Sequence, residues 1–141
     1  MNDELYILKS DFRAYNANYR LYQAAKQSYE KIVYEMQGLK GVSWDKIGRR
    51  ESLDESSKVV AMLEAKDRAE HEMMKYWIRL DAVLTCLNAV PTEDREMLME
   101  YFIDGRSTAE MAEKHGCTAK QFERKVNAAI AFGMRNGNNK G

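Results

Sequence analysis

Three polar side chains near the end of the chain, Lys120, Gln121 and Arg124, fall within two turns of one expected helix. Side chains of these types hydrogen-bond to the edges of nucleic-acid bases in the major groove. Other hydrogen-bonding groups flank them, namely Ser107, Thr108, Thr118, Lys125 and Asn127. The hydroxyls and helix-end N–H groups suit phosphate oxygens, and Lys125 and Asn127 suit the sugar-phosphate backbone. The pattern predicts a surface that contacts double-stranded DNA.

Two short helices joined by a tight turn would position these side chains. Ser107 and Glu110 form an S-x-x-E capping box, and Thr118 and Gln121 form a T-x-x-Q box. Each box marks a helix start, because a side-chain oxygen accepts a hydrogen bond from an unpaired backbone N–H. Gly116 lies between the boxes, where a helix end favours a residue that tolerates the left-handed conformation. The arrangement predicts a helix-turn-helix, with a plain helical hairpin as the alternative.

Apolar residues at helical spacing give both short helices a face to bury. They are Met111, Ala112, Phe122, Val126, Ala129 and Ile130. Pro91 ends the preceding helix, and we expect Thr92 to cap a further helix over residues 92–103. That helix would complete a three-helix core.

The charges of this region are unevenly distributed, although the whole chain has a formal net charge of zero. Residues 92–113 carry seven acidic and two basic side chains, a balance of −5. From Thr118 onward, five basic side chains oppose only Glu123, a balance of +4. One interpretation is ordinary solvated helix faces, and the other is a basic recognition helix backed by an acidic, partner-facing surface.

Several classes of protein are disfavoured by the composition. Two cysteines, Cys86 and Cys117, fall on expected apolar helix surfaces and are interpreted as reduced thiols of a cytoplasmic protein. With two histidines and no Cys or His cluster, we expect no metal site and no cofactor. We also expect no catalytic residues, because there is no Gly-rich phosphate loop and no Cys–His or Ser–His setting. No apolar run approaches the length of a membrane span.

The first 90 residues predict a long antiparallel helical hairpin of the coiled-coil type. Residues 3–37 contain a heptad seam of Leu5, Leu8, Phe12, Tyr15, Tyr19, Tyr22, Lys26, Tyr29, Val33 and Met36. A second helix, ending near residue 88, repeats the spacing with Val59, Leu63, Lys66, Glu70, Met73, Trp77, Leu80, Leu84 and Leu87. The register that matches polar to polar places Lys26 opposite Glu70 and Tyr22 opposite Met73. Association of the two helices with other copies is the alternative.

A loop at residues 38–54 separates these two helices, and its length is unusual for a compact domain. Lys46, Arg49 and Arg50 form a small basic cluster within it. We interpret the cluster either as a solvated loop or as a secondary set of phosphate contacts.

Residues 93–130 resemble region four of bacterial sigma factors, in which an acidic helix and an aromatic–x–x–Gly turn precede an E-x-A-E-x-x-G type helix-turn-helix. Here the motif runs from Tyr101 to Thr118, YFIDGRSTAEMAEKHGCT. The whole chain is similar to the phage ArpU/RinA-type late transcriptional regulators, which have a helical hairpin before a sigma-like helix-turn-helix. The resemblance implies an all-α chain with a hairpin at residues 1–90 and a DNA-binding domain at 91–134. We expect residues 135–141 to form a disordered tail.

The resemblance implies a cytoplasmic, sequence-specific regulator of transcription, such as a phage or prophage late-gene activator. The hairpin and the acidic helix would hold RNA polymerase or another copy of the chain. Two alternatives remain: a phage small terminase subunit, which marks DNA for packaging, and an antagonist that binds a sigma factor or RNA polymerase.

Overall fold

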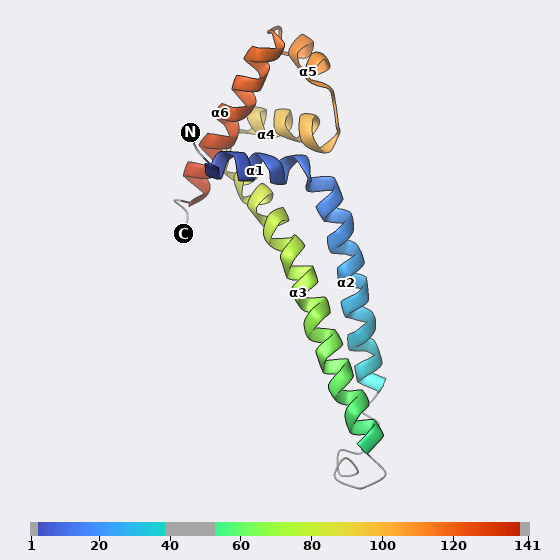
Figure 1. The fold of residues 1–141 in the computed structure, drawn as a ribbon. Helices are drawn as coiled ribbons and strands as arrows, with labels where there is room; N and C mark the ends of the chain where they lie inside the picture. Colours follow the sequence, from blue (N-terminus) through green and yellow to red (C-terminus); the bar gives the residue numbers. More distant parts are fainter. Residues whose placement is uncertain (1–2, 39–52, 139–141) are drawn as a thin grey trace. The chain divides into compact units, whose positions relative to one another are not determined.

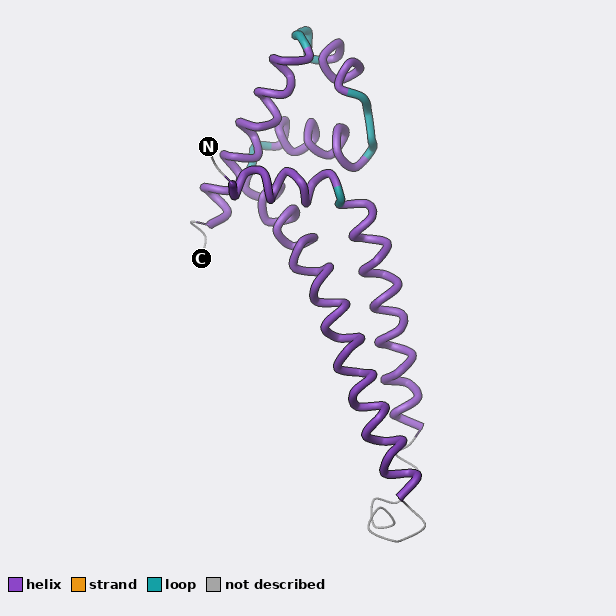
Figure 2. Tube along the Cα trace, in the orientation of Figure 1, coloured by secondary structure: helices purple, strands orange, loops and turns teal. Residues whose placement is uncertain are grey.

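The computed structural model describes residues 3–38 and 53–138, and these residues contain helices and turns but no strand (Figures 1 and 2). The elements are α1 (Asp3–Arg13), α2 (Tyr15–Gly38), α3 (Leu53–Ala89), α4 (Thr92–Leu98), η4 (Met99–Ile103), α5 (Thr108–Lys114) and α6 (Ala119–Asn138). The predicted all-α class is therefore confirmed. Among the described residues, no helix combines the length and the apolar character that a membrane span requires.

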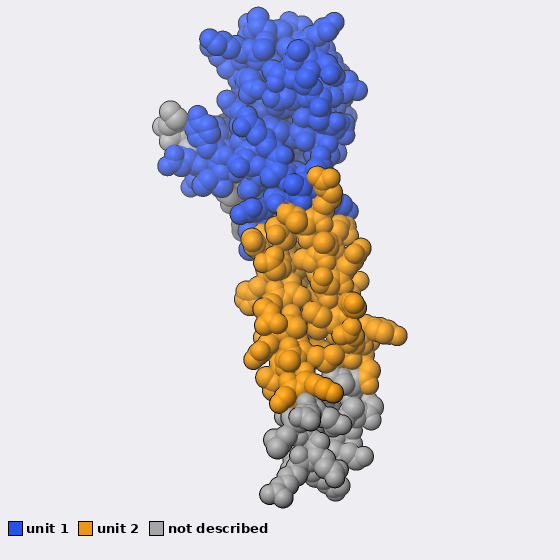
Figure 3. Space-filling view, turned by 45° about the vertical axis from the view of Figure 1, so that its right-hand side comes forward, with its two compact units in different colours: residues 1–19, 78–141 blue, residues 20–77 orange. Residues whose placement is uncertain are grey.

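The chain divides into two compact units (Figure 3). The first unit contains residues 1–19 and 78–141, and the second contains residues 20–77. The predicted boundary lies between residues 90 and 91, whereas the structure groups residues 1–19 and 78–90 of the expected hairpin with α5 and α6. Buried residues explain the grouping: Phe12 of α1 and Val83 of α3 share one core with Phe122 and Ile130 of α6.

The predicted continuous helix over residues 3–37 is interrupted at Ala14, between α1 and α2. Phe12 is fully buried, and its ring lies 5.2 Å from that of Phe102. On the other side of the interruption, Asn16 Nδ2 donates to the carbonyl oxygen of Ile103 at 2.8 Å. No Gly or Pro marks this position, so tertiary contacts rather than local sequence account for the break.

In the second unit, α2 and α3 form an antiparallel pair, but the predicted seam is only half correct. The half-buried positions are Tyr22, Gln23, Ala25, Tyr29, Ile32, Val33 and Met36 on α2, and Val59, Met62, Ala65, Lys66, Ala69, Met73 and Tyr76 on α3. The predicted seam residues Tyr22, Tyr29, Val33, Met36, Val59, Lys66 and Met73 are among them, whereas Lys26, Leu63, Glu70 and Trp77 are exposed.

The predicted register is also wrong. The ring of Tyr22, which the predicted register places opposite Met73, lies 5.6 Å from that of Trp77, one turn further along α3. Lys26 is exposed and pairs with Glu30 on its own helix at 4.0 Å, so it forms no buried pair with Glu70. Lys26 needs no partner on α3, because an exposed charged side chain can pair with an opposite charge four residues away on its own helix.

The predicted disordered tail from residue 135 is corrected at its start, because α6 continues to Asn138. Close packing of α6 on α3 explains this. A Cβ atom added at Gly133 would clash with Cys86 Sγ and lie 2.8 Å from the Cys86 carbonyl oxygen. At Gly137 the added atom would lie 3.1 Å from Thr85 Cγ2. The two glycines therefore keep the last turns of α6 on the core.

Candidate nucleic-acid interface

Side-chain caps fix the starts of α5 and α6. Ser107 Oγ accepts from the backbone N–H of Glu110 at 3.1 Å. At the start of α6, Thr118 Oγ1 accepts from the N–H of Gln121 at 3.1 Å, and Gln121 Oε1 accepts from the N–H of Thr118 at 3.0 Å. The box at Thr118 is reciprocal, as predicted, and the hydroxyl half of the Ser107 box is confirmed. The first helix of this region differs, since Pro91 rather than Thr92 precedes α4 and no side chain caps it.

The turn between α5 and α6 depends on Gly116, whose φ of 61° is accessible to glycine at no steric cost. The N–H of Cys117 reaches back to the carbonyl oxygen of Ala112 at 3.0 Å, which closes the end of α5. Met111 and Ala112 of α5 and Phe122 of α6 are buried in the same core. These contacts hold α5 against α6 as a helix-turn-helix.

The predicted base-contacting residues lie on the outward side of α6. Lys120, Gln121 and Arg124 are all exposed. Phe122 and Val126 on the same helix are fully buried. Since a helix turns once in about 3.6 residues, burial of the 122–126 side turns Lys120 and Arg124 toward solvent. The structure therefore brings these three side chains together at the start of one helix.

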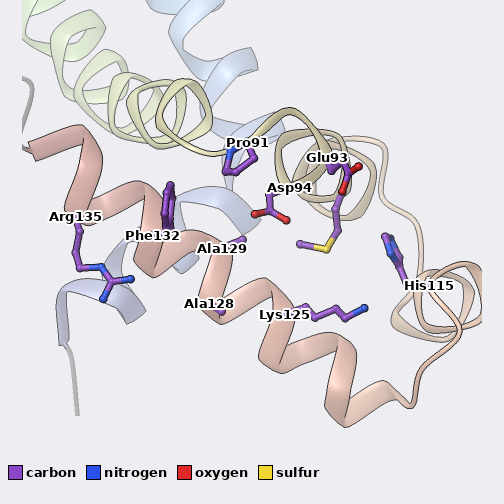
Figure 4. Close-up of a pocket in the computed structure, with 10 residues that line it drawn as sticks. Pro91, Glu93, Asp94, His115, Lys125, Ala128, Ala129, Phe132 and Arg135 are labelled. Carbon is purple, nitrogen blue, oxygen red and sulfur yellow. The ribbon is translucent and has the colours of Figure 1, made fainter.

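Lys125 lies beside the acidic start of α4 rather than with the other basic residues. It lines an open groove of about 560 Å³ together with Glu93, Asp94 and Arg135 (Figure 4). Acidic side chains of α4 and basic side chains of α6 therefore line the same groove.

Three of the predicted phosphate-contacting hydroxyls already make other contacts. Ser107 Oγ and Thr118 Oγ1 accept the cap hydrogen bonds described above. Thr108 Oγ1 lies 2.8 Å from the Tyr101 hydroxyl. Asn127 is half-buried, and its Oδ1 atom is buried without a hydrogen-bond partner. For Asn127, only the amide nitrogen is suited to a phosphate oxygen.

A polar network missed by the sequence analysis holds Glu123, the only acidic residue of α6. The Tyr101 hydroxyl donates to Glu123 Oε1 at 2.8 Å, and Lys9 Nζ of α1 lies 3.1 Å from Glu123 Oε2. Burial alone would raise the pKa of Glu123, but the hydrogen bonds from Tyr101 and Lys9, with the charges of Lys9 and Arg13, lower it below 4.5. No local pattern signals this contact, because Lys9 and Glu123 are 114 positions apart.

The π-helical turn η4 places two consecutive aromatic rings on different partners. Tyr101 meets Phe122 edge-on, with ring centroids 5.0 Å apart, while Phe102 meets Phe12 at 5.2 Å. Inserting one extra residue into a helical turn rotates the following side chains, and such turns are frequent at functional sites. Here the rotation aims the Tyr101 hydroxyl at Glu123.

An acidic surface covers α4 and η4. A smaller groove of about 210 Å³ is lined by Glu93, Glu96, Glu100, Lys114 and two neighbouring residues. Lys114 Nζ pairs with Glu100 Oε1 at 2.6 Å, and this hydrogen bond is the main cause of the lowered pKa of Glu100. Glu93 and Glu96 are exposed. Acidic side chains thus gather on α4 and η4, and Lys114 and Lys125 lie close to them.

The secondary basic cluster of Lys46, Arg49 and Arg50 lies outside the described residues. Within residues 3–38 and 53–138, no three His, Cys, Asp or Glu side chains gather in a way that could hold a metal ion. Cys86 is buried, its Sγ donates to the Ile130 carbonyl oxygen at 3.6 Å, and burial raises the pKa of its thiol to about 11. Cys86 is thus a packing residue without thiolate chemistry.

Comparison with known families assigns a class to this region. Residues 80–132 match the family described as Sigma-70, region 4. No curated protein and no solved structure matches the chain. The matched segment begins in the last turns of α3 and ends within α6. All of its residues belong to the first unit. The match supports a sigma region-four-like helix-turn-helix, which suggests a DNA-binding, regulatory role.

Proposed function

We propose that the chain is a sequence-specific, double-stranded DNA-binding regulator of transcription, with α6 entering the major groove. The observation that carries this proposal is the exposed trio Lys120, Gln121 and Arg124 at the capped start of α6. In the major groove, arginine and lysine recognise guanine, and glutamine recognises adenine. The amide oxygen of Gln121 also accepts the Thr118 cap bond, and its amide nitrogen is the donor that it would offer to a base. Phosphates would be met by the N–H groups and hydroxyls near Ser107, Thr108 and Thr118, and by Lys125 and Asn127.

The more specific proposal is a phage or prophage late-gene activator, on the resemblance to ArpU/RinA-type regulators. The acidic surface of α4 and η4 supports a partner role beside DNA binding, because a protein such as RNA polymerase could approach it without competing with the basic start of α6. The α2–α3 hairpin is the second proposed contact, either for RNA polymerase or for another copy of the chain. A cytoplasmic location follows from this role.

The decisive measurement is a mobility shift with promoter-region DNA against scrambled DNA, at low and moderate salt. Arg124→Ala should lose about 1–3 kcal/mol at the preferred site and blur the discrimination between sequences, as expected for a base-edge contact. Arg68→Ala is the matched control, since Arg68 is an exposed arginine of α3 in the other unit. Each phosphate neutralised by the wild type adds about −0.9 to the slope of log affinity against log salt.

Three results would redirect the proposal. Equal affinity of the wild type and Arg124→Ala for both DNAs removes the recognition role of α6. Absence of DNA binding at low salt, with a sigma factor or RNA polymerase captured instead, favours the antagonist. A monodisperse ring in light scattering, together with DNA binding, favours a small terminase subunit.

A further inference from the structure

The hairpin carries a second heptad stripe on α3 whose side chains are exposed, although Trp77 at one end of the stripe also packs against Tyr22 of α2. It consists of Val60, Leu63, Asp67, Glu70, Met74 and Trp77, spaced alternately three and four residues apart. We name this set the outer stripe. All six residues lie in the second unit, and they occupy positions adjacent to the seam that faces α2. Residues at this spacing lie on one face of a helix.

The apolar members of the outer stripe are unusually accessible for their type. Val60 is 51% exposed, Leu63 44%, Met74 45% and Trp77 38%. Single exposed apolar residues are normal on protein surfaces, but four large ones in heptad register along one helix are typical of an interaction face. From Val60 to Trp77 the stripe extends about 26 Å along α3.

The middle of the outer stripe is acidic. Asp67 and Glu70 separate the apolar pair Val60 and Leu63 from the pair Met74 and Trp77, and both acidic side chains are exposed. Among the described residues, no lysine, arginine or histidine side chain lies within ion-pair distance of either carboxylate. The two negative charges are therefore available to a partner.

This charge pattern disfavours a second copy of the same stripe. An antiparallel pair of stripes that matches Leu63 with Met74 would place Asp67 of each copy against Glu70 of the other. A parallel pair would place each acid against itself. Both arrangements bring like charges together between apolar contacts, where they oppose association.

We propose that the outer stripe binds an amphipathic helix of another protein, with apolar residues at three-four spacing and lysine or arginine at its middle. Apolar side chains would cover Leu63 and Trp77, and the central cations would pair with Asp67 and Glu70. The partner helix needs about five turns to match the stripe. This inference deepens the partner role proposed for the hairpin and does not require DNA binding.

The test uses the full chain with Trp44→Phe, because the sequence contains two tryptophans and Trp77 then becomes the only reporter. The probe is a synthetic helical peptide of about three heptads, with leucine at the stripe-facing positions and lysine at the two central ones. A second peptide carries glutamate at those two positions. We expect the lysine peptide to shift Trp77 emission and to bind at least about tenfold more tightly than the glutamate peptide.

Matched variants distinguish binding at the outer stripe from nonspecific binding to exposed apolar residues. Leu63→Glu should abolish peptide binding, whereas Leu21→Glu should not, because Leu21 on α2 is equally accessible at 46% but lies outside the stripe. Asp67→Lys with Glu70→Lys should reverse the peptide preference. All variants should retain wild-type mobility shifts on DNA. Loss of peptide binding is therefore distinguishable from loss of DNA binding.

Two outcomes would overturn the inference. The first is peptide binding that is insensitive to Leu63→Glu or to charge reversal. The second is a dimer in sedimentation velocity, without peptide, that Leu63→Glu dissolves, because the occupant would then be a second copy of the chain.

Discussion

At the residue scale, Glu123 shows how one acidic side chain is accommodated on the helix that we propose contacts DNA. An unpaired carboxylate near the start of α6 would repel phosphates. Its two oxygens instead accept from Tyr101 and Lys9, at 2.8 and 3.1 Å. Tyr101 also contacts Thr108 at 2.8 Å, so the same network links the starts of α5 and α6. Glu123 is thus a positioning residue rather than a DNA contact.

This network predicts a defined pH dependence of folding. The pKa of Glu123 is lowered below its ordinary value of 4.5 in the folded chain, so its stabilising contribution is present above that value. The contribution is lost as the pH falls below 4.5 through the folded pKa. Glu123→Gln should therefore lower the free energy of unfolding at pH 7 by about 1 kcal/mol, a small value because the side chain is one-third exposed.

The measurement is urea unfolding of wild type and Glu123→Gln from pH 7 to pH 3, where the difference between them should shrink. Comparing the two proteins removes the contribution of Asp11, whose pKa is raised mainly by burial and which acts in the opposite direction. Glu113→Gln serves as the control, because Glu113 is an exposed acid on α5. A difference that stays constant over this range would show that the carboxylate charge is irrelevant.

At the element scale, the contact between α6 and α3 depends on glycines that a helix normally disfavours. In a helix interior, replacing glycine with alanine normally increases the stability of the helix by about 1 kcal/mol. At Gly133 this gain cannot be realised, because the added methyl group would clash with both the thiol and the carbonyl oxygen of Cys86. The backbone of α6 would have to move away from the core.

We predict that Gly133→Ala destabilises the chain by about 1–3 kcal/mol, the usual cost of overpacking a core. Gly137→Ala is the matched substitution one turn later, where the closest atom to the added Cβ would be the Thr85 methyl group at 3.1 Å. We expect its stability to stay within about 1 kcal/mol of wild type, since helix propensity offsets the tighter contact. Thermal unfolding followed by circular dichroism compares the two, and equal melting temperatures would contradict the packing described for Gly133.

At the scale of the whole molecule, the N-terminal helix is part of the unit that carries the helix-turn-helix. Phe12 is fully buried against Phe102, and Leu8 is nearly so. A DNA-binding region limited to residues 91–134 would lose these contacts and the Lys9–Glu123 pair. The first unit is thus assembled from segments at both ends of the chain.

Phe12→Ala should therefore destabilise α5 and α6 although it lies more than ninety positions before them. Removal of a buried phenylalanine costs about 3–5 kcal/mol. Tyr6→Ala on the same helix is the control, because Tyr6 is 59% exposed and should change stability little. Hydrogen exchange of the α5 and α6 amides is the measurement, and unchanged protection in Phe12→Ala would show that α1 is dispensable to the helix-turn-helix.

Local sequence alone determined the all-α class, the helix-turn-helix and its caps. These features depend on neighbours within four residues: the hydroxyl of Thr118 and the N–H of Gln121, or the left-handed conformation at Gly116. The exposure of Lys120 and Arg124 also followed from the periodicity of their own helix. Such short-range geometry is fixed by the backbone and can be read from residue types at fixed spacing.

Tertiary structure decided the break at Ala14, the pairing of α2 with α3, the continuation of α6 and the network around Glu123. Each depends on which of several acceptable partners a side chain meets. Both Met62 and Leu63 could face α2, and the structure half-buries Met62 while leaving Leu63 exposed. Lys9 had acidic residues on its own helix and still paired with Glu123. Contacts between distant segments depend on how whole surfaces fit together, which residue spacing does not encode.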